Sequence, residues 1–174
     1  MEKQFLFEAE GISFSLRRLV EKDLSRCAEV IRESFIGVAE EFGLTPGNCP
    51  ANTAFMPDGQ LKGKFAEGLP MFLALAGDAF AGFFMLEEDR FVEGAQMLKK
   101  LAVLPAFRHH GLGKALLEAA AEQARVLGAK KLTIGIIEEN TQLKNWYLAN
   151  GFIHTGTKRF NHLPFTVGYM EKIV

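Results

Sequence analysis

The sequence predicts a single α/β domain in which a mixed sheet carries helices on its faces. The 174 residues are enough for one domain with a substantial core. Segments with alternating or continuous apolar residues are interleaved with segments of helical periodicity. No repeat or low-complexity linker divides residues 1–174. The expected order is β-α-(α)-β-β-β-α-β-α-β-β, which indicates a mixed α/β fold.

The first half is expected to supply a strand, two helices and a hairpin. Residues 11–19 alternate like a half-buried strand, and Asp23 can cap the helix that follows. The region 37–68 is less regular and should hold a loop and a short helix over "DGQLKGKFAEG". The run "MFLALAGDAFAGFFML" is short for a membrane span and contains Gly77-Asp78, so it predicts a hairpin. The strands of this hairpin are expected at 71–76 and 79–86.

The second half alternates strands and helices. A strand is expected within 91–104, and leucine and alanine recur at helical spacing over 112–127 until Gly128 ends the helix. "KKLTIGII" is typical of a buried strand, and Asn140 or Thr141 should begin a helix over "TQLKNWYLAN". "FIHTGTKRF" and "FTVGYMEKIV" predict two closing strands around "NHLP".

Composition limits the classes of function. A formal net charge of -1 gives no general attraction for nucleic acid or acidic membranes, so neither is an expected partner. Cys27 and Cys49 lack the density of a disulfide scaffold, and the first ten residues lack a signal peptide's apolar stretch. We therefore expect a cytoplasmic protein. His154 and His162 do not have the spacing of metal ligands, so no metal is expected.

The segment "RHHGLGKA" carries the main functional signal because it joins a predicted strand to a predicted helix. It lacks the first glycine and the hydroxyl of a P-loop, and Leu116 stands where a dinucleotide fingerprint needs Gly or Ala. The unpaired amides of the first helical turn favour an anion, which Gly111 and Gly113 would let approach. Arg108 and Lys114 add positive charge. These features predict a pyrophosphate site; the alternative is an ordinary turn with solvated basic residues.

Two segments resemble the GCN5-related N-acetyltransferase (GNAT) family. "LAVLPAFRHHGLGKALL" is similar to the family's acetyl-CoA motif, and "NTQLKNWYLANGF" is similar to its second signature of Asn, a Tyr seven residues later, and Gly-Phe. The resemblance implies a GNAT-type, mostly antiparallel sheet of about six or seven strands flanked by about four helices. It also implies an enzyme that moves acetyl from acetyl-CoA directly to a primary amine of a small molecule or peptide. A homodimer is one assembly that it allows.

The resemblance assigns roles to individual residues. The main chain of one strand end would bind the pantetheine arm, and the following loop would bind the pyrophosphate. Tyr147 would protonate the leaving thiolate as a general acid; the alternative is a core tyrosine bonded to a backbone carbonyl. The residues implied to bind the cofactor are Leu101, Ala102, Val103, Arg108, His109, His110, Gly111, Leu112, Gly113, Lys114, Asn140 and Tyr147.

The sequence departs from part of the family at the general base. Met97 stands where some members have Glu, which leaves Glu93, Glu40, Glu41 or a water chain as alternatives. Positioning of the amine can by itself lower the reaction barrier by about 7–11 kcal/mol.

Two further hypotheses for the function stay open, a catalytically weak acyl-CoA-binding module with a regulatory role and a nucleotide-binding protein. Residues 36–68 should shape the acceptor pocket, and "RFNHLPF" is either a specificity loop or a plain hairpin connection.

Overall fold

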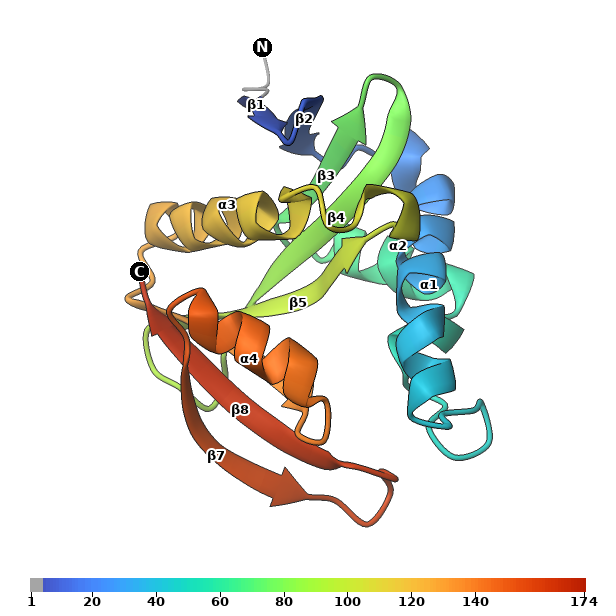
Figure 1. Ribbon diagram of the computed structural model, residues 1–174, viewed down its shortest axis with the longest axis vertical. Coiled ribbons are helices and arrows are strands. Elements are labelled where there is room, and N and C mark those ends of the chain that lie inside the picture. The colour runs from blue at the N-terminus through green and yellow to red at the C-terminus, as the bar shows by residue number, and fades with distance from the viewer. Residues whose placement is uncertain (1–4) are drawn as a thin grey trace.

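The computed structural model describes residues 5–174, in which eight strands form one sheet and four α-helices flank it (Figure 1). The sheet order is β1-β2-β3-β4-β5-β6-β8-β7, and all pairs are antiparallel except β5–β6. This confirms the predicted mixed, mostly antiparallel sheet, with a strand count slightly above the expected range. The elements are β1 (Phe5–Ala9), β2 (Ile12–Arg18), α1 (Leu24–Glu41), α2 (Asp58–Ala66), β3 (Met71–Ala76), β4 (Ala79–Glu88), β5 (Ala95–Val103), α3 (Leu112–Val126), β6 (Lys131–Ile137), α4 (Thr141–Ala149), β7 (Ile153–Arg159) and β8 (Thr166–Ile173).

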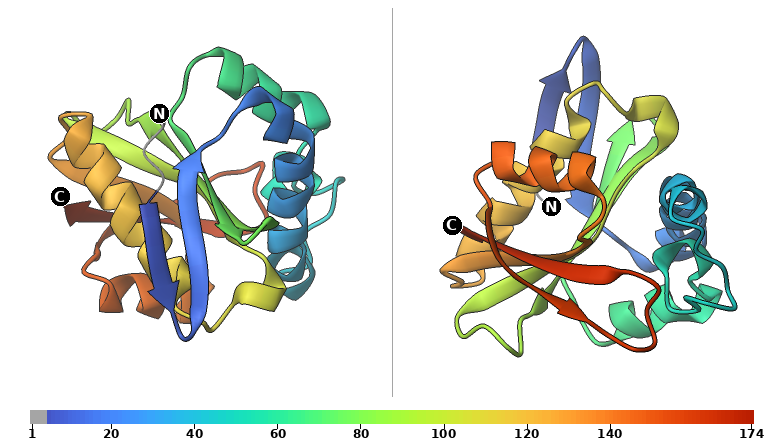
Figure 2. Two further views of the ribbon diagram at one scale, coloured as in Figure 1. Left: turned by 90° about the horizontal axis from the view of Figure 1, so that it is seen from above. Right: turned by 60° about the horizontal axis from the view of Figure 1, so that its bottom comes forward.

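Helices cover both faces of the sheet, which explains why β3 and residues 79–86 of β4 are apolar instead of alternating. Phe72 and Phe84 stack at 4.9 Å between ring centroids and belong to the core that includes α3 and α4. Their neighbours Leu73 and Phe83 point to the other face, into the core under α1 and α2. Both views of Figure 2 place α3 and α4 on one side of the sheet and α1 and α2 on the other.

The first strand, β1, was not predicted. It pairs with β2 through a two-residue turn in which Glu10 and Gly11 both have positive φ, at 48° and 80°. That backbone is typical of a type I′ hairpin turn, where glycine is favoured. Phe5 and Phe7 alternate with Leu6 and Glu8 before the Glu-Gly pair, so the sequence did carry a signal for this hairpin.

The first helix corrects two expectations. It runs through Gly37 to Glu41, beyond the point where the irregular region was expected to begin, and buries Ala39 in its last turn. Asp23 lies at the N-cap position, yet its side chain makes no cap hydrogen bond. Its carboxylate instead accepts from Arg17 at 2.6 Å, and this guanidinium holds the pKa of Asp23 below its usual value. A nearby arginine thus outcompetes the backbone N–H groups of the helix.

Candidate active site

Strands β5 and β6 form a fork, because they pair over only part of their length. The paired residues are Ala95–Lys131, Gln96–Leu132 and Met97–Thr133, although the strands continue to Val103 and Ile137. Beyond that point β6 stays paired with β8, and β5 stays paired with β4. The β6-facing edge of β5 therefore has no strand partner after Met97 within residues 5–174. Backbone groups on such an edge need water or a ligand.

The expected pantetheine-binding residues lie at the end of this open edge. Ala102 is buried under α1 and α2, whereas Leu101 and Val103 pack toward the core of α3 and α4. A Cβ atom at Gly82 of β4 would lie 2.8 Å from the Ala102 carbonyl oxygen and 2.8 Å from a methyl carbon of Leu116. Only glycine fits there without a shift of its neighbours, so β4 packs closely against the part of β5 whose other edge is open.

The loop that follows presents a helix N-terminus without a side-chain cap. The chain leaves β5, passes through a short 3-10 helix at Pro105–Phe107 and turns into α3 at Gly111, as Figure 1 shows. His109 and Gly111 have φ of 63° and 76°. A Cβ at Gly113 would make only ordinary contacts, the nearest at 3.5 Å, so the protein's own packing does not require glycine there. The N-cap residue Gly111 offers the amides at 112–114 no side-chain acceptor.

The basic side chains of the loop differ in what they contact. Arg108 donates through Nε to the Val103 carbonyl at 3.2 Å and through Nη2 to the Ser34 carbonyl at 2.6 Å. It therefore ties the loop to β5 and α1, a role that the sequence did not suggest. His110 lies 3.6 Å from Glu10, and the exposed Lys114 has Glu118 at 3.9 Å. Lys114 thus remains the cation best placed to meet an anion from solvent.

Both residues of the second signature are held by α4. Asn140 accepts a hydrogen bond from the Leu143 N–H at 3.0 Å and so caps the helix. The Tyr147 ring is buried, 4.9 Å from the Trp146 ring and 5.3 Å from the Phe152 ring. A Cβ at Gly113 would contact Trp146, so α4 lies beside the first turn of α3. The two sequence segments therefore meet in space.

The hydroxyl and the ring of Tyr147 have different surroundings. The hydroxyl makes no hydrogen bond to another described residue, and no buried polar side-chain atom of residues 5–174 is both sealed from solvent and unpartnered. Tyr147 as a whole is only 6% exposed, so its hydroxyl lies at the edge of the core without a partner among the described residues. Burial raises the pKa of Tyr147 well above its usual value, so the group stays protonated and can donate.

The three acidic residues considered as general bases are all exposed. Glu93 precedes β5 in an exposed turn, so it does not lie on the strand. Glu40 and Glu41 are exposed on the last turn of α1. Met97 is half-buried at the last paired position of the fork.

A charged cluster next to α4 was missed by sequence reasoning. Glu138 accepts from Lys144 of α4 and lies 2.9 Å from Nε2 of His154 on β7. The Lys144 hydrogen bond and the charge of His154 hold the pKa of Glu138 below its usual value. A Cβ at Gly168 would collide with this carboxylate, so the glycine makes room for it. His154 thus acts as a hydrogen-bond partner that anchors α4. Within the described part of the chain no cluster of metal-ligating side chains is found.

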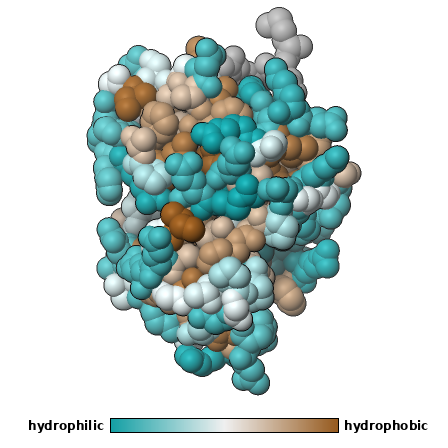
Figure 3. Space-filling view, turned by 90° about the vertical axis from the view of Figure 1, so that its right-hand side faces the viewer, coloured by the Kyte–Doolittle hydropathy of each residue, from teal (hydrophilic) through white to brown (hydrophobic). Residues whose placement is uncertain are grey.

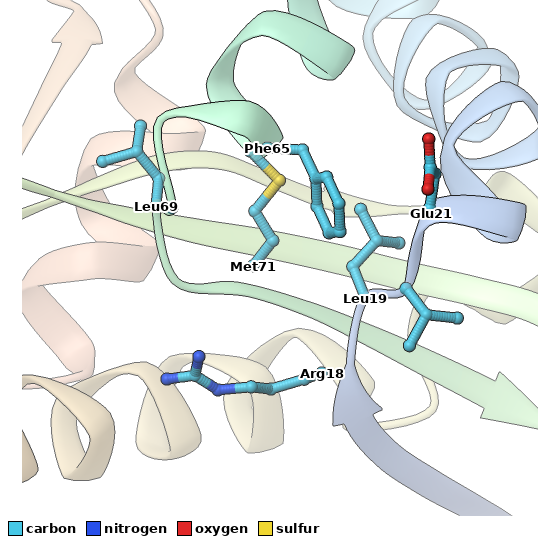
Figure 4. Close-up of a pocket in the computed structure, with 8 residues that line it drawn as sticks. Arg18, Leu19, Glu21, Phe65, Leu69 and Met71 are labelled. Atoms are coloured by element: carbon cyan, nitrogen blue, oxygen red, sulfur yellow. The ribbon is translucent and has the colours of Figure 1, made fainter.

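A separate cavity of about 330 Å³ lies between α2 and the start of β3. Leu19, Phe65 and Met71 approach one another there, and Glu21 lies at its edge (Figure 4). None of the residues expected to bind acetyl-CoA lines it, so this hollow is distinct from the fork.

No helix within residues 5–174 has the length and apolar character needed to cross a membrane.

Comparisons with known proteins agree with this geometry. Residues 37–152 match the acetyltransferase (GNAT) family. An uncharacterized N-acetyltransferase in the pepI 3′ region of Lactobacillus delbrueckii subsp. lactis is 29% identical over 159 residues, covering 85% of this chain and 86% of that protein.

Solved structures share the fold. The ribosomal-protein-S18-alanine N-acetyltransferase of Escherichia coli has a TM-score of 0.72 at 17% identity, covering 92% of this chain and 94% of that one. The structure of yncA from Salmonella typhimurium with its cofactor acetyl-CoA has a TM-score of 0.69 at 18% identity, covering 92% and 93%. The match to residues 37–152 includes the fork, the loop before α3 and all of α4, and the chain therefore belongs to the acetyltransferase (GNAT) family.

Proposed function

We propose that this protein transfers an acetyl group from acetyl-CoA to a primary amine of a small-molecule or peptide acceptor. One observation carries the proposal: the open edge of β5 leads directly into the uncapped N-terminus of α3. A strand edge without a strand partner, followed by an anion site, matches an amide-containing arm that ends in a pyrophosphate. Membership of the GNAT family, and a neighbour solved with acetyl-CoA, support the same donor.

The donor would lie along the fork. Backbone groups of Leu101–Val103 would hydrogen-bond the pantetheine amides, as an added strand would. The amides of residues 109–114 would hold the pyrophosphate, with the exposed Lys114 adding charge. Asn140 would then border the arm while it caps α4.

Tyr147 would assist the step in which the thioester breaks. The amine nitrogen forms a bond to the carbonyl carbon, the carbon–sulfur bond breaks, and the sulfur takes the Tyr147 hydroxyl proton. The proton that the amine loses passes through water and restores the hydroxyl. Acetyl-CoA supplies the activated acyl group, and the fork holds it against the amine; such positioning can contribute about 7–11 kcal/mol.

A second candidate is an acyl-CoA-binding module with weak or no turnover. It is favoured by Met97 at the fork and by the absence of Glu93 from the strand face. Both candidates predict donor binding, and only the enzyme predicts that an amine releases CoA. The two are therefore separated by turnover.

The test has a binding arm and a turnover arm. Acetyl-CoA should raise the melting temperature at a concentration where NAD and ATP do not, and stabilisation by ATP alone would contradict the donor assignment. Release of CoA thiol is then followed with a panel of amines. Release above the amine-free background supports the enzyme, whereas tight donor binding without release by any amine supports the module.

A further inference from the structure

Two neighbouring lysines of β5, Lys99 and Lys100, lie in the part of the fork where β5 has no partner on its β6 side. Lys99 is opposite Met85 in the β4–β5 register, and Met85 is buried in the core under α1 and α2. Paired residues of neighbouring strands point to the same face, so Lys99 points there as well. Lys100 follows at the point where the register shifts between Phe83 and Met85.

Lys100 combines three features that folding alone does not favour. Its φ is 53°, a left-handed backbone that is unusual for any residue other than glycine. Its side chain is half-buried, and it forms no hydrogen bond or ion pair with any described residue. Burial and then the charges of Lys99 and of Lys64 on α2 lower the pKa of Lys100. Strained and unpartnered groups of this kind are typical of functional sites.

The carboxylates in this region do not neutralise the pair. Glu87, the acid of β4 on this face, lies 3.2 Å from Lys64, and Glu67 lies 3.1 Å from the same lysine. Lys99 has no ion pair within residues 5–174. Neither lysine of β5 is therefore neutralised by an ion pair with a described residue, although the chain as a whole carries a formal net charge of -1.

The two lysines lie where an acceptor would meet the donor. The open edge of β5 begins after Met97, and the proposed pantetheine site follows at Leu101–Val103. On the opposite face the fork is closed by the core that includes Tyr147 and α3. An acceptor must therefore approach from the α1 side, which Figure 3 shows as mainly hydrophilic with apolar patches between.

We propose that the acceptor is an amine that also carries a carboxylate, and that Lys99 and Lys100 bind this carboxylate. The proposal rests on the acetyltransferase function proposed above. A cationic site repels polyamines, which would place a second positive charge beside the lysines. It also favours the neutral form of the acceptor amine, which is the form that attacks a thioester.

The experiment compares matched acceptors that differ only in charge. Leucine and leucinamide, phenylalanine and phenylalaninamide, and spermidine are each tested for CoA release from acetyl-CoA. The wild-type protein should prefer each acid over its amide on the order of 10- to 100-fold in kcat/KM, the range of a hydrogen bond to a charged group. Spermidine should be the poorest acceptor.

Variants assign the preference to the lysines. Lys100→Gln and Lys100→Gly should both remove most of the acid-over-amide preference, while Lys100→Arg should retain it. Lys100→Gly also suits the left-handed backbone, so its melting temperature should equal or exceed that of the wild type. Lys62→Gln, at an exposed position on α2, is the matched control and should leave the preference unchanged.

The outcomes separate this proposal from the proposed function. Equal use of acid and amide, preferred use of spermidine, or an unchanged preference in both neutral Lys100 variants would overturn the carboxylate site while acetyl transfer stands. A preference for succinyl-CoA over acetyl-CoA as the donor, without a preference for acidic acceptors, would assign the lysines to the acyl group. This result would also overturn the carboxylate site for the acceptor. If no amine releases CoA, the proposed function fails. In that case the affinities of the protein for N-acetylleucine and N-acetylleucinamide, each measured by calorimetric titration with CoA present, decide the carboxylate site alone.

Discussion

Replacement of Tyr147 by phenylalanine separates chemistry from folding. The ring of Tyr147 packs against Trp146 and Phe152, and phenylalanine keeps these contacts. The hydroxyl makes no hydrogen bond to another described residue, so its removal leaves no protein group without a partner. We therefore expect the free energy of unfolding to change by less than about 1 kcal/mol.

The effect on turnover should be much larger. General acid catalysis contributes about 10²- to 10⁴-fold, which corresponds to about 3–5 kcal/mol of transition-state stabilisation. Acetyl-CoA binding should change little, because the donor site proposed above consists of the fork and the loop before α3. The burial that raises the pKa of Tyr147 keeps the hydroxyl protonated, so the wild-type rate should not fall through ionisation of this group below about pH 10.

The assay is steady-state release of CoA thiol with one competent amine, together with thermal unfolding of both proteins. We expect kcat to fall at least 100-fold while the KM for acetyl-CoA and the melting temperature stay nearly constant. Trp146→Phe is a useful comparison, because it changes packing and leaves the Tyr147 hydroxyl in place. A Tyr147→Phe variant with wild-type kcat would remove the hydroxyl from the chemistry.

Three other substitutions test the supporting structure. Gly82→Ala forces a methyl group against a β5 carbonyl and should cost about 1–3 kcal/mol of stability in a denaturant titration, with an unchanged value contradicting the close contact. Arg108→Lys cannot keep both hydrogen bonds to the backbone carbonyls. It should raise the KM for acetyl-CoA about tenfold with little change in kcat, and an unchanged KM in steady-state kinetics would contradict this role. Glu138→Gln should lower the melting temperature at pH 7. Because the folded pKa of Glu138 is depressed, its stabilisation is present above its usual value of 4.5 and is lost as pH falls through the folded pKa. The difference between the two proteins should therefore shrink in acid, and a constant difference would contradict the ion pair.

Local patterns predicted most elements because their causes are local. Gly128 and Gly151 end α3 and α4 with φ of 82° and 85°, which only a residue without a side chain adopts freely. The β3–β4 hairpin follows from Gly77-Asp78 between two apolar runs. The end of α1 was less visible, since a glycine inside a helix costs only about 1 kcal/mol and packing of Ala39 offsets it.

The roles of site residues depended on long-range contacts and were harder to predict. The sequence placed Arg108 among the loop cations, yet its partner Ser34 lies 74 positions away along the chain. Glu138 and His154 meet because β6 and β7 flank β8, where Gly168 leaves room for the carboxylate. Motif spacing identifies which residues gather, whereas the direction of each side chain depends on neighbours that the motif does not contain.

The fork itself illustrates why a single strand can support both folding and binding. On its β4 side, β5 is held by a register that ends at Gly82 and Val103, with the carbonyl of Ala102 close to the glycine. On its β6 side the same strand loses its partner after Met97, so its backbone is rigid and yet unpaired. A ligand that binds there meets groups already ordered by the sheet and loses little of its affinity to ordering the protein. The same rigidity can hold Lys100 at its left-handed φ, because β4 fixes the strand on both sides of the register shift. The proposed acetyl-CoA site and the proposed carboxylate site are then two consequences of one irregular strand, and Lys100→Gly should weaken the second without disturbing the first.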